Sequence, residues 1–387
     1  MSQDSSAGAV LRAVLAEGSM PRSMIARAAG LSPATVTARV RELRAAGVLS
    51  ELPETASAAG LGRPHSPLVL DTGGNVVIGV HIAAEHCTVA VLDIAGQVRL
   101  SHRVPHLGQD PETILAAAAD EVGRLRAELT ERVLGLGVAI GGWVDSPAGS
   151  VVAHGTLPWR NVAVRQYFSQ QTGLPVTVDS HTRALVHAEQ LFGQARQASA
   201  TVVLFAGNVI DVAFAVHGRV HYGPRSAAGA ITRLVRGEPE SAMADCTDRA
   251  LLARARRMGL PAESIPDLIL AAGAHPGARA IFVDRARALG QVVAVVVDLL
   301  DPDSVVIVDT ALERVPGVRA AYLDAVRRFS TCERPEQILT GSSFFGRLLE
   351  TAAGTVVLQR LFTDPLAVIA DAESAARRSI EFDSHLF

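Results

Sequence analysis

The feature that most constrains the fold is a change of hydrophobic pattern near residue 75. Over residues 8–47, apolar side chains recur with the spacing of short helices. From Asn75 onward, strand-like apolar runs alternate with amphipathic helical stretches, and a second set begins at TVVLFAGNVIDVAFAVHGRVHYG. We therefore predict a small helical domain over residues 1–70, followed by two related α/β lobes around a cleft, residues 71–195 and 196–365.

The first domain carries the signals of a helix-turn-helix. Residues 9–17 place valines and leucines on one face, and a second short helix ends at Gly30. In LSPATVTARVRELRAAG, Ser32 is the expected N-cap, Pro33 the first helical residue, and Gly47 lies beyond the last turn. This succession of helix, tight turn and helix predicts a DNA-binding unit.

The third helix presents small and hydroxyl side chains opposite its apolar stripe. Such a face can enter the major groove, where arginine reads guanine edges or holds phosphates. We expect specific contacts from Thr35, Thr37 and Arg41, with Ser32 and Arg39 as phosphate contacts or caps. The alternative is a solvated helical hairpin without a role in DNA binding.

The segment after the third helix has the pattern of a wing. GVLSELPETASAAGLGRPHSPLVLDT reads as strand, loop and strand, and Arg63 lies between glycine and proline at the loop tip. An arginine on such a tip suits a narrow minor groove in A·T-rich DNA. A flexible linker turn is the alternative interpretation.

Charge and composition limit the classes of partner. The net charge of −3 excludes a globally basic protein, so any contact with DNA must come from a local patch. No apolar stretch reaches the roughly eighteen residues of a membrane span, and the N-terminus lacks a signal-peptide pattern. Cys87, Cys246 and Cys332 are far apart, which argues against disulfides and thiolate metal sites. We expect a cytoplasmic protein.

Several motifs, in order along nearly the whole chain, resemble the ROK family (repressors, open reading frames and sugar kinases). GLSPATVTARVRELRAAGVL and LGRP resemble the DNA-binding end of its regulators. The motifs that resemble landmarks of the family's body are GVAIGGWVD, TLPWRNVAV, GLPVTVD, HAEQLFG, HGRVHYG with AAGAI, and LLDPDSVVIVD.

The resemblance implies an α/β protein: an N-terminal winged helix-turn-helix followed by a two-lobed actin-like or sugar-kinase-like (ribonuclease H-like) body. A C-terminal helix over residues 366–387 would complete the first lobe, and the second lobe would carry the oligomer interface. The implied function is a transcriptional regulator of the repressor type that binds a double-stranded DNA operator as a homodimer or tetramer.

The positions at which the family's kinases hold nucleotide have changed. The first phosphate turn, Asp-Ile-Gly-Gly-Thr in the kinases, corresponds to His81–Glu85, HIAAE. The second corresponds to AGNVIDVA, where Asp211 would repel a triphosphate. A glycine pair after a late strand corresponds to Asp309 and Thr310. The resemblance therefore implies a body without catalysis or a cofactor.

The catalytic base of the kinases corresponds to His181, within DSHTR, residues 179–183. Histidine can accept a proton, but without bound ATP there is no phosphoryl group to transfer. One alternative is a divergent sugar kinase that kept a helix-turn-helix. Another is a protein-interaction module in which DNA contacts are secondary.

The family's zinc site and sugar contacts have also changed. Arg233 stands at the position of the zinc-binding histidine, and Cys246 remains from a three-cysteine run, so we expect no metal. Two interpretations of the cleft stay open. The cleft binds an anionic effector, or its side chains pair with one another and bind nothing. The candidate effector residues are Asp179, His181, Arg183 and Arg233.

Overall fold

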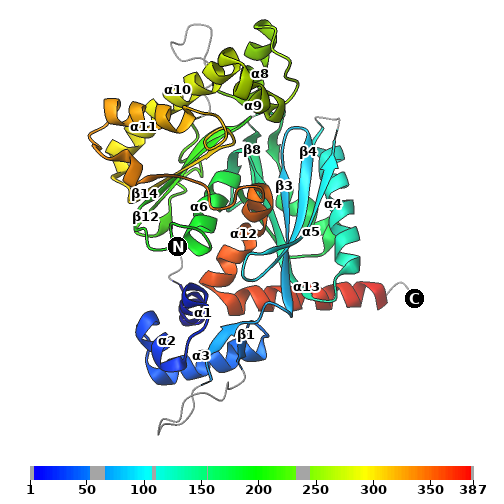
Figure 1. Ribbon diagram of the computed structural model, residues 1–387. Coiled ribbons are helices and arrows are strands. Elements are labelled where there is room, and N and C mark those ends of the chain that lie inside the picture. Colours follow the sequence, from blue (N-terminus) through cyan, green and yellow to red (C-terminus); the bar gives the residue numbers. More distant parts are fainter. Residues whose placement is uncertain (1–3, 53–65, 107–109, 155, 232–244, 385–387) are drawn as a thin grey trace.

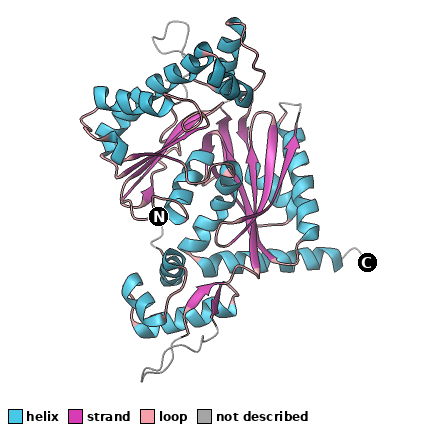
Figure 2. Cartoon of the chain, in the orientation of Figure 1, coloured by secondary structure: helices cyan, strands magenta, loops and turns pink. Residues whose placement is uncertain are grey.

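The computed structural model describes residues 4–52, 66–106, 110–154, 156–231 and 245–384. Figure 1 shows a small N-terminal domain at the base of the molecule and two larger lobes above it. Figure 2 shows that each of the two lobes is built on a sheet with helices against it. The predicted organisation into a helical domain and two α/β lobes is therefore confirmed.

The N-terminal domain is a winged helix. Its helices enclose a small core, and Ser32 caps α3 by accepting a hydrogen bond from the Thr35 backbone N–H at 3.1 Å. Pro33 occupies the first turn of α3, as predicted. The wing strands β1 and β2 pair antiparallel, while the predicted wing tip with Arg63 lies outside the described residues. The elements are α1 (Ser6–Glu17), α2 (Arg22–Ala29), α3 (Pro33–Ala45), β1 (Leu49–Glu51) and β2 (Leu68–Leu70).

The first lobe has a five-stranded sheet of order β10-β6-β3-β4-β5. The strands β3, β4 and β5 form an antiparallel meander, and β6 and β10 add parallel strands on the other side of β3. A second, three-stranded sheet, β7-β8-β9, extends this lobe. The elements are β3 (Asn75–Ile82), β4 (His86–Asp93), β5 (Val98–Pro105), α4 (Pro111–Glu128), β6 (Arg132–Ile140), β7 (Gly142–Asp145), β8 (Ser150–His154), β9 (Arg160–Val162), α5 (Val164–Thr172), β10 (Val176–Ser180) and α6 (His181–Leu191).

The second lobe repeats the strand order of the first. Its sheet runs β13-β12-β11-β14-β15, with an antiparallel meander followed by two parallel strands. This repetition is the ribonuclease H-like arrangement that the resemblance implied. The elements are β11 (Thr201–Ala206), β12 (Ile210–Val216), β13 (Arg219–Val220), α8 (Asp248–Arg257), α9 (Ile265–Ala274), α10 (Pro276–Leu300), β14 (Ser304–Asp309), α11 (Val318–Phe329), a 3₁₀ turn η1 (Pro335–Gln337) and β15 (Leu339–Gly341).

Two C-terminal helices follow, α12 (Leu348–Thr363) and α13 (Pro365–Ser384). We assigned residues 348–363 to the second lobe from their order in the sequence, and that assignment is wrong. Helix α12 packs on β3, β4 and β6 of the first lobe and against α6. Glycines in the sheet permit this approach, since a Cβ atom at Gly79 would lie 2.6 Å from the Gly354 backbone nitrogen.

The winged helix and the first lobe share one hydrophobic core. Apolar residues of α1, among them Leu11 and Val14, cluster with Phe362 of α12 and Ile369 of α13. Within the described parts of the chain, no single helix is long and apolar enough to cross a membrane; α12 and α13 satisfy the length and composition criteria only as a pair, which is bent by 116°.

Candidate DNA-binding face and interlobe cleft

Helix α3 orients its predicted DNA-contacting side chains in different ways. Arg41 and Thr37 are exposed, while Val36, Val40 and Leu43 on the opposite side are buried. The Thr37 hydroxyl donates to the Pro33 carbonyl at 2.8 Å. Among the described residues, the Arg41 guanidinium has no hydrogen-bond or ion-pair partner. Arg41 is therefore an arginine on this face that stays available to an external partner.

The remaining predicted residues on α3 have local partners. The Ser32 hydroxyl caps the helix and lies 2.8 Å from the Thr35 hydroxyl. The Arg39 guanidinium forms an ion pair with Glu42 at 2.7 Å. Nearby, Glu51 of β1 accepts a hydrogen bond from Arg22 at 2.5 Å and forms an ion pair with Arg44 at 3.2 Å, which ties the wing strand to two helices.

A buried ion pair of the first lobe lies at the cleft between the lobes. Asp179 is the penultimate residue of β10, and Arg183 lies in the first turn of α6, which the Ser180 hydroxyl caps. The Arg183 Nε atom donates to Asp179 Oδ1 at 2.7 Å, and both side chains are almost inaccessible to solvent. The strand-to-helix junction thus brings together a carboxylate from β10 and a guanidinium from the first turn of α6.

Arg183 and Asp179 also reach across to the second lobe. The Arg183 guanidinium donates to the carbonyl oxygen of Ser226 at 3.0 Å, and the Tyr222 hydroxyl donates to Asp179 Oδ2 at 2.9 Å. The Ser146 hydroxyl donates to Asp179 Oδ1 at 2.7 Å. Within the first lobe, Arg183 Nη2 donates to the Val144 carbonyl at 2.8 Å. Asp179 and Arg183 therefore each have hydrogen-bond partners in both lobes.

Further bonds join the lobes on either side of this ion pair. The Gly142 backbone N–H donates to Asp211 at 3.2 Å, and the Trp143 indole N–H donates to the Arg225 carbonyl at 2.8 Å. The Asp211 carboxylate, which the sequence predicts would repel a triphosphate, faces a backbone N–H of the first lobe.

His181 lies between the two sheets and pairs with another histidine. Its Nδ1 atom is 3.2 Å from Nε2 of His81, at the end of β3, and the two rings are parallel within 5°. On its other side, His181 stacks on Phe205 of β11 with ring centroids 4.1 Å apart. The positions that correspond to the first phosphate turn and to the catalytic base are therefore in contact with each other.

Burial keeps these histidines neutral. Desolvation lowers the pKa of His181 to about 3, with smaller contributions from His154 and Arg183. Desolvation also lowers the pKa of His81 well below its usual value, and the neighbouring His181 adds to this effect. The pKa of His154 falls to about 4 for the same main reason. These rings are hydrogen-bonding and packing groups rather than cations at neutral pH.

A second buried ionic cluster lies at the end of β14. Asp309, which corresponds to one of the kinase glycines, accepts from Arg285 of α10 at 2.6 Å and from the Tyr322 hydroxyl at 3.0 Å. Arg285 also donates to Asp248 at 2.6 Å. Desolvation and the neighbouring Asp309 carboxylate raise the pKa of Tyr322 well above its usual value. Charged side chains thus occupy a position that the kinases keep free with glycine.

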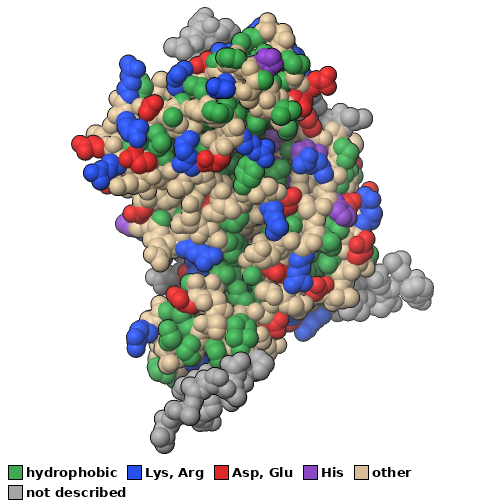
Figure 3. All heavy atoms as spheres, in the orientation of Figure 1, with side chains coloured by type: hydrophobic (Ala, Val, Ile, Leu, Met, Phe, Trp, Pro, Cys, Tyr) green, Lys and Arg blue, Asp and Glu red, His purple; other side chains and the backbone are tan. Residues whose placement is uncertain are grey.

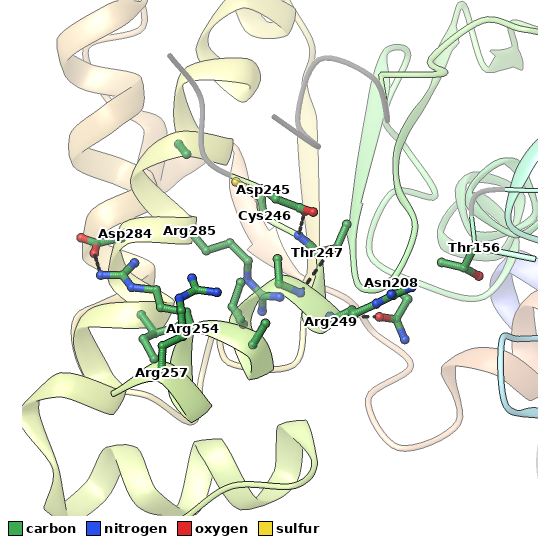
Figure 4. A pocket seen from close by; sticks show the side chains of 15 residues that line it. Thr156, Asn208, Asp245, Cys246, Thr247, Arg249, Arg254, Arg257, Asp284 and Arg285 are labelled. Atoms are coloured by element: carbon green, nitrogen blue, oxygen red, sulfur yellow. Dashed lines mark hydrogen bonds and ion pairs between the residues drawn. The ribbon is translucent and has the colours of Figure 1, made fainter. Parts of the chain in front are cut away.

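A cavity of about 520 Å³ adjoins this cluster. Figure 4 shows Arg254 directed to Asp284 at one side of the cavity, and Arg249 beside Asn208 toward Thr156 of the first lobe. Its arginines lie among carboxylates, so the cavity is mixed in charge rather than cationic. Figure 3 likewise shows acidic and basic side chains interspersed over the second lobe on the face in view.

The structure brings together three of the four predicted effector residues, Asp179, His181 and Arg183, while Arg233 lies outside the described residues. Across the described ranges, no group of three or more His, Cys, Asp or Glu side chains is arranged to hold a metal ion. The sequence interpretation did not anticipate Tyr222 and Ser146 as partners of the ion pair. A buried tyrosine hydroxyl needs an acceptor, but the sequence does not indicate which carboxylate supplies it.

Glu189, near the C-terminal end of α6, is a further buried charged group. Its carboxylate accepts from the Ser342 hydroxyl at 2.9 Å and from the backbone N–H and hydroxyl of Ser343 at 2.8 and 2.6 Å. These contacts fasten α6 to the segment between β15 and α12. Among the charged side chains of the cleft, the alternative of mutual pairing is thus seen for Asp179 and Arg183, while Glu189 is held by serines.

Two family models match the chain. Residues 3–50 match a winged helix-turn-helix DNA-binding model, and residues 77–329 match the ROK family model. The first match covers α1 to α3, and the second covers most of both lobes.

Curated relatives include regulators of transcription. A transcriptional regulator of Mycobacterium tuberculosis is 33% identical over 408 residues, covering 99% of this chain and 90% of the relative. The xylose repressor of Caldicellulosiruptor bescii is 24% identical, with 57% of this chain and 56% of the relative covered. The N-acetylglucosamine repressor of Escherichia coli O157:H7 is 22% identical, with 77% and 79% covered.

Solved structures show the same fold. A ROK family transcriptional regulator, described as a homologue of the Escherichia coli MLC protein, has a TM-score of 0.77 at 23% identity over 95% of this chain and 98% of its own. A ROK family glucokinase from Streptomyces griseus has a TM-score of 0.63 at 20% identity, over 72% of this chain and 98% of its own.

Proposed function

The chain belongs to the ROK family and is a DNA-binding transcriptional regulator of that family, and from this premise we propose how its parts divide the work. Helix α3 reads a double-stranded operator, and the protein acts as a repressor. The kinase-like body carries no catalysis and serves to hold together the winged helices of a dimer or tetramer. Because its target is chromosomal DNA, we place the protein in the cytoplasm.

Arg41 is the observation that supports the DNA contact most directly. It is exposed on α3, opposite a buried apolar stripe, and has no recorded partner in the described part of the chain. Thr37 lies on the same exposed side. The hydroxyls of Ser32 and Thr35 contact each other at the start of the helix. We propose Arg41 for base recognition, Thr37, Thr35, Ser32 and Arg39 for groove or phosphate contacts, and Arg63 for the minor groove.

The test uses DNA selected from a random double-stranded pool by the wild-type chain. Arg41→Ala should weaken binding to the selected sequence by about tenfold or more and relax the base preference at one position of each half-site. Fluorescence anisotropy over a salt series measures both the affinity and its salt dependence. The control is Arg124→Ala, which removes an exposed arginine of α4 that pairs with Glu121 at 2.6 Å. Equal losses in the two variants would contradict the proposal.

The loss of catalysis is proposed from the contact between His81 and His181. These residues stand at the positions of the kinases' phosphate-turn acid and catalytic base, and here their rings contact each other at 3.2 Å. Asp309 adds a carboxylate, paired with Arg285, where the kinases have glycine. Magnesium nucleotide would have to displace these buried contacts in order to bind.

A phosphorylation assay tests the absence of catalysis. With glucose, xylose or N-acetylglucosamine and magnesium ATP, we expect neither sugar phosphate nor ADP above the protein-free rate. We also expect the melting temperature to stay unchanged with magnesium ATP, since a ligand that binds the folded state raises it. Sugar-dependent ADP release that vanishes in His181→Gln would support the divergent kinase instead.

The ion pair of Asp179 and Arg183 is proposed as a tie between the lobes rather than as an effector site. Both charges already have partners from the two lobes, so a ligand would gain little from either group. His181 is buried and neutral, so it offers no cation to an anionic effector. Two relatives are named for xylose and for N-acetylglucosamine. A rise in melting temperature with either sugar, or with phosphate or citrate, would contradict this proposal.

A further inference from the structure

The C-terminal end of α3 lies against the first lobe at the beginning of two parallel strands. Asn75 begins β3 and Arg132 begins β6, and the two residues are register partners in the sheet. The connector between the wing and the lobe is short, from Asp71 to Gly74, and ends in two glycines. By itself, a glycine pair would let the winged helix turn relative to the lobe.

Side chains of the first lobe hold the end of the helix. The Asn75 Nδ2 atom donates to the Gly47 carbonyl at 2.6 Å, and the Arg132 Nη2 atom donates to the Ala46 carbonyl. Arg132 Nε donates to Asn75 Oδ1 at 2.8 Å, so the two donors brace each other. Arg132 Nη1 then reaches Glu373 of α13 at 3.2 Å.

These bonds are made at the C-terminal end of α3, where backbone carbonyls lack hydrogen-bond donors within the helix. The last carbonyls of an α-helix have no intrahelical donor, and the helix dipole places partial negative charge there, which favours a cation such as Arg132. Asn75 is only 1% exposed, so water has little access to replace its bond. A third donor, Arg99 of β5, bonds to the carbonyl of Thr72 in the connector.

We propose that Arg132 and Asn75 are positioning residues for DNA binding. Together with the packing of α1 on α12, they fix the orientation of α3 on the first lobe and so set the spacing of operator half-sites that a dimer accepts. The inference rests on the proposed function of α3. Arg41 lies five residues before Ala46, about 7.5 Å along the helix, so any rotation at this end moves the DNA-contacting side chain with it.

Half-site spacing is the measurement that separates positioning from affinity. One added base pair turns the second half-site by about a tenth of a helical turn, which a rigid dimer cannot follow. With the selected operator and versions whose spacing differs by one or two base pairs, we expect the wild-type chain to lose about tenfold in affinity per change. We expect Arg132→Gln and Asn75→Ala to lose less than about threefold, while binding an isolated half-site as the wild type does.

Two further variants control for charge and for folding. Arg132→Lys keeps the cation at the helix end and should recover part of the spacing dependence. Arg124→Gln, on the exposed surface of α4, should match the wild type. Circular dichroism and a cooperative urea transition establish that each variant is folded.

The outcomes distinguish the clamp, by which we mean the bonds of Arg132 and Asn75 to the end of α3, from the proposed function on which it rests. Failure of the wild-type chain to select any DNA would contradict the proposed function itself. Wild-type binding that ignores the spacing would overturn the clamp, and so would full spacing dependence in both Arg132→Gln and Asn75→Ala. Loss of isolated half-site binding in these folded variants would also overturn it, because Arg132 and Asn75 would then act on affinity rather than on geometry.

Discussion

At the scale of single residues, the cleft is dominated by buried charges that already have partners. Asp179 accepts hydrogen bonds from Ser146, Arg183 and Tyr222, and Arg183 donates to carbonyls of both lobes. Removing one member of such a pair leaves an uncompensated charge in a poorly solvated site. The two residues therefore matter for stability even if they touch no ligand.

We expect Arg183→Met to lower the free energy of unfolding by about 3–5 kcal/mol, because Asp179 would stay buried without its cation. The double variant Asp179→Asn with Arg183→Met should recover part of this loss, since the buried charge is then gone. Urea denaturation followed by circular dichroism measures all three proteins. The exposed pair of Arg124 and Glu121 provides the control, and Arg124→Met should cost less than about 1 kcal/mol. A cost of less than about 1 kcal/mol for Arg183→Met would contradict the role of this ion pair as a tie between the lobes.

His181 gives an expectation for pH. Its pKa is about 3 in the folded protein and 6.5 as a free side chain, so between these values the unfolded chain binds a proton that the folded protein does not. Stability therefore falls as the pH drops from 6.5 toward 3, by up to about 1.4 kcal/mol per pH unit for this group. His181→Gln should make the slope of unfolding free energy against pH shallower between pH 6 and 4.5, as measured in urea, by roughly one proton. An unchanged slope would show that His181 is not the neutral buried group described here.

Local signals in the sequence predicted some residues well. Ser32 and Pro33 mark the start of α3 through capping chemistry that acts within three residues. The partners of Arg183 could not be predicted in this way. The Ser226 carbonyl is 43 residues away, and it meets the guanidinium only after the second lobe has folded back over the first.

At the scale of elements, α12 joins the parts of the molecule. It is buried over most of its length, with the first-lobe sheet on one side, α6 on another and α1 at its end. The backbone N–H and hydroxyl of Ser5 bond to the Thr363 carbonyl, and Arg12 donates to the Phe362 carbonyl at 3.1 Å. The winged helix therefore caps the C-terminal end of α12.

A substitution at Gly8 of α1 tests this contact, because the change in unfolding free energy should have the opposite sign from that of Gly→Ala in an exposed helix. In an exposed helix, Gly→Ala stabilises by about 0.5–1 kcal/mol. At Gly8, a Cβ atom would meet the Thr363 carbonyl and would lie 2.7 Å from the Phe362 oxygen, so we expect Gly8→Ala to destabilise by about 1–3 kcal/mol. Gly123→Ala in α4, where no heavy atom lies within 4 Å, should show the stabilising sign. Urea denaturation of both variants measures the difference, and two changes of the same sign would contradict the packing of α1 on α12.

The strands were more predictable than this helix. Strand-like apolar runs from Asn75 onward predicted strands where β3, β4 and β5 are found, because composition and turn residues indicate strands locally. The lobe to which α12 belongs depends on close contacts between glycines in the sheet and the helix backbone, and sequence order alone pointed to the wrong lobe.

At the scale of the whole molecule, the same two strands connect the DNA-binding end with the cleft. Strands β3 and β6 begin beside α3 at Asn75 and Arg132. They end beside the cleft, where His81 lies on β3 and Gly141 follows β6 and packs against His181. Figure 1 shows the winged helix below the first lobe, with α13 extending along the base of that lobe. A fixed winged helix on a two-lobed body is the arrangement that we expect of a protein whose output is operator binding.

The central claim is that this chain recognises particular DNA sequences, and selection from genomic DNA tests it most directly. The full chain is incubated with sheared bacterial DNA at about physiological salt, where nonspecific contacts are weak, and the bound fragments are sequenced. We expect a recurring sequence with two related half-sites, enriched by the wild-type chain and lost with Arg41→Ala. Recovery of fragments without any shared sequence, at low salt as well as at physiological salt, would contradict the account.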